Sequence, residues 1–211
     1  MANGFDLEKV LRELRKKRKA FVSEADFQLA LAWQIKQMYK DEVEVRCEYP
    51  LESDSSIHID IVVIKKNKWI PIELKYKTKE CNIDDNDKFH LKNHGAKDVG
   101  CYDYLKDISR IEKISKRKEF WKGYTVLLTN DLSYLKKPKK EKAYYRNFSL
   151  ENKKKLHRYL RWDGNTSDET VNARPNFNLS KYYSCHWKKY TDVNTSDGEI
   201  VFKYLMHVIN K

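Results

Sequence analysis

The sequence predicts an α/β fold in which helices flank a mixed central sheet. Two helical segments with apolar stripes precede three strand-like segments, and a long helical segment separates these from a continuously apolar strand. Apolar spacing of three to four residues indicates helices, whereas alternation and short apolar runs indicate strands. The resulting α-β-β-β-α-β order favours helices packed on a sheet over a bundle or an all-β fold.

The first two elements are predicted as helices. Residues 6–19 form a charged amphipathic helix with an apolar side made of Leu7, Val10, Leu11 and Leu14. A second helix over about 23–40 is capped by Ser23, and Asp26 three positions later completes a capping-box pattern. Its apolar stripe repeats at helical spacing and consists of Phe27, Leu31, Ile35 and Met38.

Strands follow the second helix. The segment "EVEVRCEY" over 42–49 alternates as a half-buried strand. The segments 57–65 and 68–77 are joined by "KKNK", which predicts a hairpin. Residues 78–97 are polar and are predicted to form a loop.

The second half of the chain is predicted to begin with a helix over about 98–120 and a buried strand over 123–131. A short helix over 149–159, irregular strands within 160–195 and a closing helix over 198–210 are expected after them. Without an internal repeat or linker, residues 1–211 are expected to form a single domain. Its parts are the basic N-terminal helix 6–19, a core over about 22–131, and an α/β or irregular C-terminal elaboration over 132–211.

The composition indicates a folded, basic protein. The 211 residues are 40% hydrophobic and 13% aromatic, which argues against disorder, and the formal net charge is +12. Much of this charge lies in residues 9–19 and 136–158, where seven and ten Lys and Arg residues face one and two Glu residues. Such segments favour a nucleic-acid backbone, although a solvated helix face and a loop would look the same.

The cellular compartment is predicted to be the cytoplasm. No segment resembles a signal peptide, and no apolar run approaches the length needed to cross a bilayer, so no membrane association is expected. The four cysteines show neither CxxC pairing nor zinc spacing and are interpreted as reduced thiols; they are Cys47, Cys81, Cys101 and Cys185.

Charged residues interrupt the most apolar segment, "IHIDIVVIKKNKWIPIELKYKTK". Side chains alternate between the two faces of a strand, so Glu73 and Lys75 share one face, and Asp60 lies opposite Glu73 or a neighbour in the hairpin. The other face is apolar and is formed by Ile57, Ile59, Ile61, Val63, Ile70, Ile72, Leu74 and Tyr76. Paired carboxylates suit a hard cation such as Mg²⁺, and a nearby ammonium can orient water.

Each of these residues also has an ordinary explanation. An ExK triplet alone is common on exposed strands, but Asp60 lies among apolar neighbours and is expected in a sheltered site. Glu24 projects onto the apolar stripe of the second helix and would point toward the sheet. A first-turn glutamate that stabilises the helix dipole is the alternative for Glu24, and Gln28 one turn later could support the same site.

The set of Glu24, Asp60 and "ELK" at 73–75, within the α-β-β-β-α-β order, resembles the PD-(D/E)xK nuclease superfamily. The resemblance covers about 22–131 and departs at Ile59, where the motif has a proline. It implies a restriction-endonuclease-like core with Asp60, Glu73, the Leu74 carbonyl and, as an accessory ligand, Glu24 around a metal. Lys75 would assist the attacking water.

The function implied by this resemblance is Mg²⁺-dependent hydrolysis of DNA, by an endonuclease, with Mn²⁺ able to substitute. A homodimer is in keeping with nucleases of this type that cut both strands. The alternatives are a non-catalytic nucleic-acid-binding protein of the same fold and an interaction module of a defence or toxin system.

Two further groups have unassigned roles. A polar side of the helix 98–120 could face the site and is formed by Asp98, Tyr102, Asp103 and Lys106. C-terminal aromatic residues could stack on bases, although packing onto the core is favoured; they are Trp162, Tyr182, Tyr183, Trp187 and Tyr190.

Overall fold

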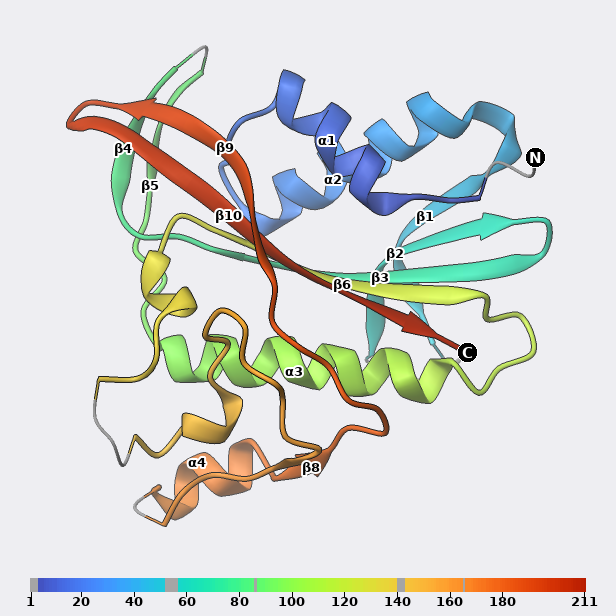
Figure 1. Ribbon diagram of the computed structural model, residues 1–211. Coiled ribbons are helices and arrows are strands. Elements are labelled where there is room, and N and C mark those ends of the chain that lie inside the picture. Colours follow the sequence, from blue (N-terminus) through green and yellow to red (C-terminus); the bar gives the residue numbers. More distant parts are fainter. Residues whose placement is uncertain (1–3, 52–56, 86, 140–142, 165) are drawn as a thin grey trace.

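The computed structural model describes residues 4–51, 57–85, 87–139, 143–164 and 166–211. Its centre is an eight-stranded mixed sheet with the order β1-β2-β3-β6-β10-β9-β4-β5 (Figure 1). All neighbours are antiparallel except β3 and β6, which run parallel. The strands are β1 (Glu44–Pro50), β2 (His58–Lys65), β3 (Lys68–Lys77), β4 (Cys81–Asp84), β5 (Lys88–Leu91), β6 (Lys122–Thr129), β9 (Trp187–Thr195) and β10 (Gly198–Asn210).

Helices cover both faces of this sheet, so the predicted α/β class with a mixed sheet is confirmed. Helices α1 (Leu7–Lys17) and α2 (Glu24–Tyr39) lie on one face, and α3 (Lys97–Ile114) lies on the other (Figure 1). Beyond α3 lies a C-terminal segment with α4 (Asp168–Ala173) and the small pair β7 (Tyr159–Leu160) and β8 (Phe177–Asn178). The 3₁₀ turns are η1 (Lys40–Glu42), η2 (Leu132–Leu135) and η3 (Arg146–Phe148).

The first core lies between the sheet and the two N-terminal helices. Ser23 caps α2 by accepting a hydrogen bond from the Asp26 N–H, as its position predicts. Three members of the predicted α2 stripe, Phe27, Leu31 and Ile35, are buried, and Met38 packs at the margin. The buried stripe of α1 is the predicted one, formed by Leu7, Val10, Leu11 and Leu14.

The second core lies between the sheet and α3. It combines apolar residues of α3 with the inward residues of the C-terminal segment, which include Phe148, Leu150, Leu160 and Trp162. Because these side chains complete the cover of α3, the C-terminal segment belongs to the same packing unit as the sheet.

The β2–β3 hairpin has the predicted register. Ile61 pairs with Ile72, and the tight turn places Lys66 and Asn67 in the left-handed region, with φ of 50° and 59°. Pairing between the strands ends at Ile61 and Ile72, after which β3 continues beside β6 alone. The hairpin therefore opens into a fork on the side away from its turn.

The apolar face is as predicted except at its start, where Ile57 is 48% exposed and Ile59 lies in the other core. Ile61, Val63 and the four β3 residues pack in the first core, but Ile59 packs in the second. The change of face occurs opposite an irregularity in β1. There Glu48 has a φ of 50°, and it is not paired with Asp60 in the β1–β2 ladder.

Two of the predicted boundaries were wrong near the middle of the chain. The segment 78–97 contains the hairpin of β4 and β5 rather than only a loop, and its polar residues suit a hairpin at the sheet edge. The helix predicted over 98–120 ends at Ile114, where turns lead into β6.

The C-terminal predictions were also wrong in type. No helix covers 149–159, where backbone bonds to Tyr183 and Cys185 hold an irregular segment. The closing helix predicted over 198–210 is the strand β10, which lies between β6 and β9 and buries residues on both faces. Residues 160–195 include α4 and the regular strand β9 instead of irregular strands alone. In the part of the chain that the structure describes, no helix is long and apolar enough to cross a bilayer.

Candidate active site

The fork between β2 and β3 brings two of the predicted acids together. The Leu74 N–H donates to Asp60 Oδ2 at 2.5 Å, and the Tyr76 N–H donates to Glu24 Oε2 at 2.7 Å. Backbone N–H groups inside a fold need hydrogen-bond partners. Because β2 has separated from β3 here, the carboxylates of Asp60 and Glu24 accept these bonds in place of the β2 backbone. Asp60 and Glu24 therefore lie side by side along the open edge of β3.

Gln28 fixes the backbone at Asp60. Its amide donates to the Asp60 carbonyl at 2.5 Å and to Glu48 Oε1 at 2.6 Å. Both bonds come from one side chain on the second turn of α2, so the helix that carries Glu24 also holds the strand that carries Asp60. The two acids are thus positioned by the same contact between α2 and β2.

The side chains of Glu73 and Lys75 point from β3 toward α3. Glu73 is 1% exposed, and its Oε1 accepts a hydrogen bond from Arg110 Nη1 at 2.7 Å. Lys75 Nζ lies 3.0 Å from Asp107 Oδ2 and donates to the Leu74 carbonyl at 3.0 Å. Its distance to Glu24 Oε1 is 3.9 Å. The ammonium of Lys75 therefore lies between acids from both helical layers.

Two residues of this cluster, Asp107 and Arg110 of α3, were missed from the sequence. Arg110 also contacts Asp107 at 3.3 Å and so links it to Glu73. A signal was present, because Asp107 lies three residues after Tyr104 and four before Ile111, both buried. A charged residue on the buried stripe of a helix marks a polar site within the fold.

Of the polar side of α3 that could face the site, Asp98, Tyr102 and Asp103 do not do so, whereas Lys106 also lines a cavity that it shares with Arg110. Asp98 accepts a hydrogen bond from Tyr144, and Tyr102 donates to the Pro175 carbonyl. Asp103 lies 3.8 Å from Arg174, and the ammonium of Lys106 lies 4.8 Å from the ring centroid of Phe177. These residues hold the C-terminal segment on α3.

Burial dominates the electrostatics of the carboxyl groups. It raises the pKa of Asp60, against the opposing effects of Lys75, the Leu74 N–H and a hydrogen bond with Glu73. Burial and the neighbouring charges of Asp107 and Asp60 raise the pKa of Glu73 well above its ordinary value. Burial also raises the pKa of Asp107 to about 6, although Lys75 and Arg110 oppose it.

Lys75 remains charged in this environment. Burial favours its neutral amine, but Asp107, Glu24 and Asp60 outweigh burial and raise its pKa above the ordinary value. The cluster thus sets four carboxyl groups (Glu24, Asp60, Glu73 and Asp107) against two cations, Lys75 and Arg110. When all four carboxyl groups are ionised, they exceed the two cations by two negative charges, which one divalent cation would neutralise.

The donor set fits a hard divalent cation held with water. Glu73 Oε2 is buried and has no hydrogen-bond partner in the described part of the chain. Asp60 and the Leu74 carbonyl supply further oxygen atoms beside it. The described residues contain no group of three or more His, Cys, Asp or Glu arranged to hold a metal. Two carboxylates and a carbonyl suit Mg²⁺, which keeps several waters, better than an all-protein cage.

A basic cavity adjoins this cluster. It has a volume of about 400 Å³, and one wall is formed by α3 and the turn after it, with Lys106, Ser109, Arg110, Lys113, Ile114 and Arg117. Burial lowers the pKa of Lys106, and the positive charges of Lys113 and Arg110 lower it further. Because these cations repel one another, an anion in the cavity would relieve the repulsion. We refer to this wall as the α3 basic wall.

The two basic segments singled out from the sequence lie elsewhere. Helix α1 covers the face of the sheet opposite α3 (Figure 1), and several of its cations have intramolecular partners, such as Lys16 with Glu13. In the segment 136–158, residues 140–142 lie outside the described residues. Lys154 of this segment donates to three backbone carbonyl groups, so its role is to hold the loop.

The C-terminal aromatic residues mostly pack, as favoured. Trp162, Tyr183 and Tyr190 are buried, and Trp187 is half-buried with its indole N–H donating to the Leu150 carbonyl. Tyr182 is the exception at 79% exposed.

No protein-family model, curated protein or solved structure matches the chain. Its function is therefore inferred from the geometry and chemistry of the site.

Proposed function

We propose that the protein is a metal-dependent nuclease that hydrolyses DNA phosphodiester bonds, as an endonuclease. The observation that supports this best is the convergence of Asp60, Glu73 and Lys75 where β2 and β3 separate. Apart from the β4–β5 hairpin between β3 and α3, helix α2, the strands β1 to β3, helix α3 and strand β6 follow the order of the restriction-endonuclease-like core that the motif implies.

Asp60, Glu73 and the Leu74 carbonyl would hold the metal. Bound there, Mg²⁺ or Mn²⁺ would polarise the scissile phosphate and lower the pKa of a bound water. The orphaned Oε2 atom of Glu73 and the excess negative charge of the cluster both favour a cation at this place. Arg110 holds the other oxygen of Glu73 and so fixes the direction in which Oε2 points.

Lys75 supplies a fixed positive charge beside the reacting phosphate. Asp107 and Glu24 keep its ammonium protonated, so it acts by orienting water and stabilising the developing oxyanion rather than by accepting a proton. Glu24 was predicted as an accessory metal ligand. Its Oε2 is bonded to the Tyr76 N–H and its Oε1 lies 3.9 Å from Lys75, so besides this accessory role it would position Lys75 and the edge of β3.

The α3 basic wall would bind the phosphate backbone on its way to the site. Arg110 and Lys113 are three residues apart on α3, and Arg117 follows in the turns after the end of the helix. Together they present three cations on one wall of the cavity, where they could contact the phosphates of a strand. Arg110 belongs to both the wall and the acidic cluster, so the path ends at Glu73.

The test is metal-dependent cleavage by the purified chain. Supercoiled plasmid, linear duplex, single-stranded DNA and RNA are incubated with Mg²⁺, with Mn²⁺ or with EDTA. We expect cleavage of DNA that requires the metal and is lost in Asp60→Asn, Glu73→Gln and Lys75→Met, with melting temperatures that show the variants are folded. Lys16→Met is the matched control, because Lys16 lies exposed on α1 and its ammonium pairs with Glu13.

A non-catalytic nucleic-acid-binding protein of the same fold is the second candidate. It is favoured by the ion pairs of Glu73 with Arg110 and of Lys75 with Asp107, because these pairs already neutralise part of the charge of the cluster without a metal ion. This candidate predicts salt-dependent DNA binding, without cleavage, that Lys113→Gln weakens. Cleavage that persists unchanged in both Asp60→Asn and Lys75→Met would contradict the nuclease assignment.

A further inference from the structure

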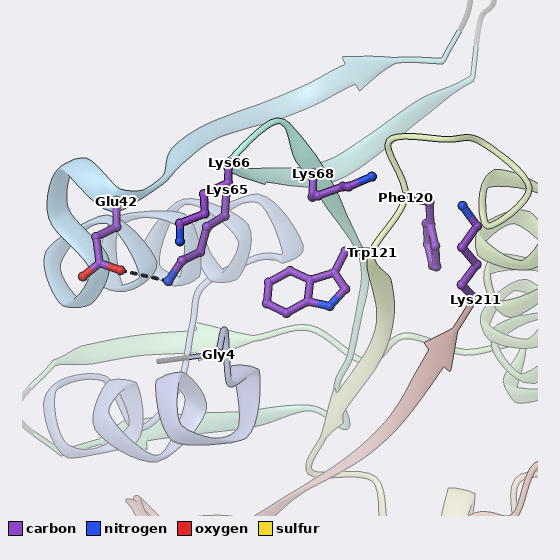
Figure 2. A pocket seen from close by; sticks show the side chains of 8 residues that line it. All are labelled: Gly4, Glu42, Lys65, Lys66, Lys68, Phe120, Trp121 and Lys211. Carbon is purple, nitrogen blue, oxygen red and sulfur yellow. Dashed lines mark hydrogen bonds and ion pairs between the residues drawn. The ribbon is translucent and has the colours of Figure 1, made fainter. Parts of the chain in front are cut away.

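A second cavity lies at the turn of the β2–β3 hairpin, at the end opposite the fork. It has a volume of about 600 Å³, within the range of small-molecule sites. Figure 2 shows the indole of Trp121 in its middle, with lysines of the hairpin on one side and Lys211 of the C-terminal end of β10 on the other. The lining includes Glu42, Lys65, Lys66, Lys68, Phe120 and Trp121.

The indole of Trp121 gives the cavity an aromatic surface. The side chain is 39% exposed, its backbone N–H donates to the Trp69 carbonyl at 3.0 Å, and Phe120 beside it is buried. The ammonium of Lys122 lies 5.1 Å from the indole centroid. A partly exposed tryptophan on an anchored backbone presents an apolar surface on which a planar group can pack.

The charge of the cavity is strongly positive. Of the described residues that line it, four are lysines and Glu42 is the single acid. Glu42 pairs with Lys65 at 2.8 Å. Lys68 and Lys211 donate to the carbonyl groups of Lys118 and Arg117, which accept a hydrogen bond but do not neutralise a charge. Lys66, Lys68 and Lys211 therefore leave an unbalanced positive field around the indole.

We propose that this cavity binds a nucleoside phosphate unit, with its base stacked on Trp121 and its phosphate between Lys66, Lys68 and Lys211. A planar base would stack on the indole, whereas an inorganic anion would leave the indole without a partner. A phosphate would pair with the lysines, whereas an apolar ligand would leave their charges unpaired. The unit can come from a free nucleotide or from a nucleic-acid strand, because both present the same chemistry.

This site is separate from the proposed catalytic cluster. Lys65 lies five residues from Asp60 along β2, and Lys68 lies five residues from Glu73 along β3. At about 3.3 Å per residue the two places are about 16 Å apart. The inference therefore goes beyond the proposed nuclease activity and does not depend on it.

The experiment is calorimetric titration of the whole chain in EDTA, so that metal-dependent cleavage does not interfere. The probes are dAMP, dATP, a five-nucleotide single strand, adenosine alone and inorganic pyrophosphate. We expect dATP or the oligonucleotide to bind more tightly than adenosine or pyrophosphate. Binding by dATP identifies a free nucleotide as the source of the unit, and binding by the oligonucleotide alone identifies a strand.

Variants separate this site from the fork. Trp121→Ala should weaken binding about ten- to a hundredfold, and Trp121→Phe should keep most of it because a ring remains. Lys68→Gln should weaken it and lower its salt dependence. Trp33→Ala is the matched control, since Trp33 is an exposed tryptophan of α2, 66% exposed, outside the cavity.

Lys75→Met should leave this binding unchanged even where it abolishes cleavage, so the two proposals fail independently. Equal affinity for pyrophosphate and dATP, or binding that Trp121→Ala does not change, would overturn the assignment. Absence of binding by every nucleotide probe would overturn it as well.

Discussion

The ion pair between Arg110 and Glu73 allows a quantitative test of the acidic cluster. Removing one partner of a buried pair costs about 3–5 kcal/mol, because the other charge is left buried. The Arg110 side chain is 31% exposed and Glu73 is fully buried, so solvent screening reduces the expected cost of Arg110→Met to about 2 kcal/mol. For a chain of this size, about 2–4 °C per kcal/mol corresponds to a melting temperature lower by about 4–8 °C.

The loss should depend on pH with a defined sign. The pKa of Glu73 is already above its ordinary value in the fold and should rise further without Arg110. A carboxyl group whose pKa is raised on folding stays protonated in the native state up to a higher pH than in the unfolded chain. Its buried negative charge therefore lowers the free energy of unfolding only as the pH rises. The difference between the wild type and Arg110→Met should therefore be larger at pH 8 than at pH 5.5.

The assay is urea denaturation followed by tryptophan fluorescence, at both pH values, for Arg110→Met, Glu73→Gln and the double variant. Because Glu73→Gln removes the buried charge, the double variant should be about 1–2 kcal/mol more stable than additivity predicts. Arg12→Met, an exposed arginine of α1, should cost less than about 0.5 kcal/mol. Additive costs, or a loss of equal size at both pH values, would refute this description of the cluster.

Three further outcomes are expected. Burial lowers the pKa of His207 to about 4 in the folded protein, so as the pH falls from about 6.5 toward 4 the unfolded chain takes up a proton before the folded chain does. The urea midpoint of unfolding should therefore fall over this pH range. The variant His207→Gln should show a weaker pH dependence. Lys154→Met should cost about 2 kcal/mol in thermal melts, because Lys154 donates to three backbone carbonyl groups, whereas its exposed neighbour Lys155→Met should cost little. Lys113→Gln should reduce by about one the slope of the logarithm of the DNA-binding constant against the logarithm of the salt concentration, without changing the melting temperature. An unchanged slope would show that the DNA backbone binds elsewhere on the protein.

Local patterns predicted the N-terminal half of the fold well. The strict alternation of the 57–77 segment identifies the hairpin and its register, since a slip of one residue would move every apolar side chain to the wrong face. The cap at Ser23 and the stripe that begins at Phe27 identify α2 in the same way. These signals depend only on neighbouring residues, so one sequence contains them.

The failures have a common cause in tertiary context. Residues 198–210 are apolar on both faces because β10 is an interior strand, and such a run has the same pattern as a buried helix. The place of Arg110 against Glu73 depends on how α3 crosses β3, which no local pattern contains. Asp60 and Glu73 were found because they share a strand face, and Glu24 because it projects onto the apolar stripe of its helix, whereas Asp107 on α3 was not found.

Strand β10 also sets the order in which the sheet can be completed. It joins β6 to β9 and so connects the β1-β2-β3-β6 half to the β9-β4-β5 half, although its residues are synthesised after all of those strands. Until Gly198–Asn210 has left the ribosome, β6 lacks its partner on one side and exposes an apolar edge. A nascent chain that contains the whole acidic cluster but not β10 is therefore still prone to aggregation, and the sheet can close only after β10 has been synthesised.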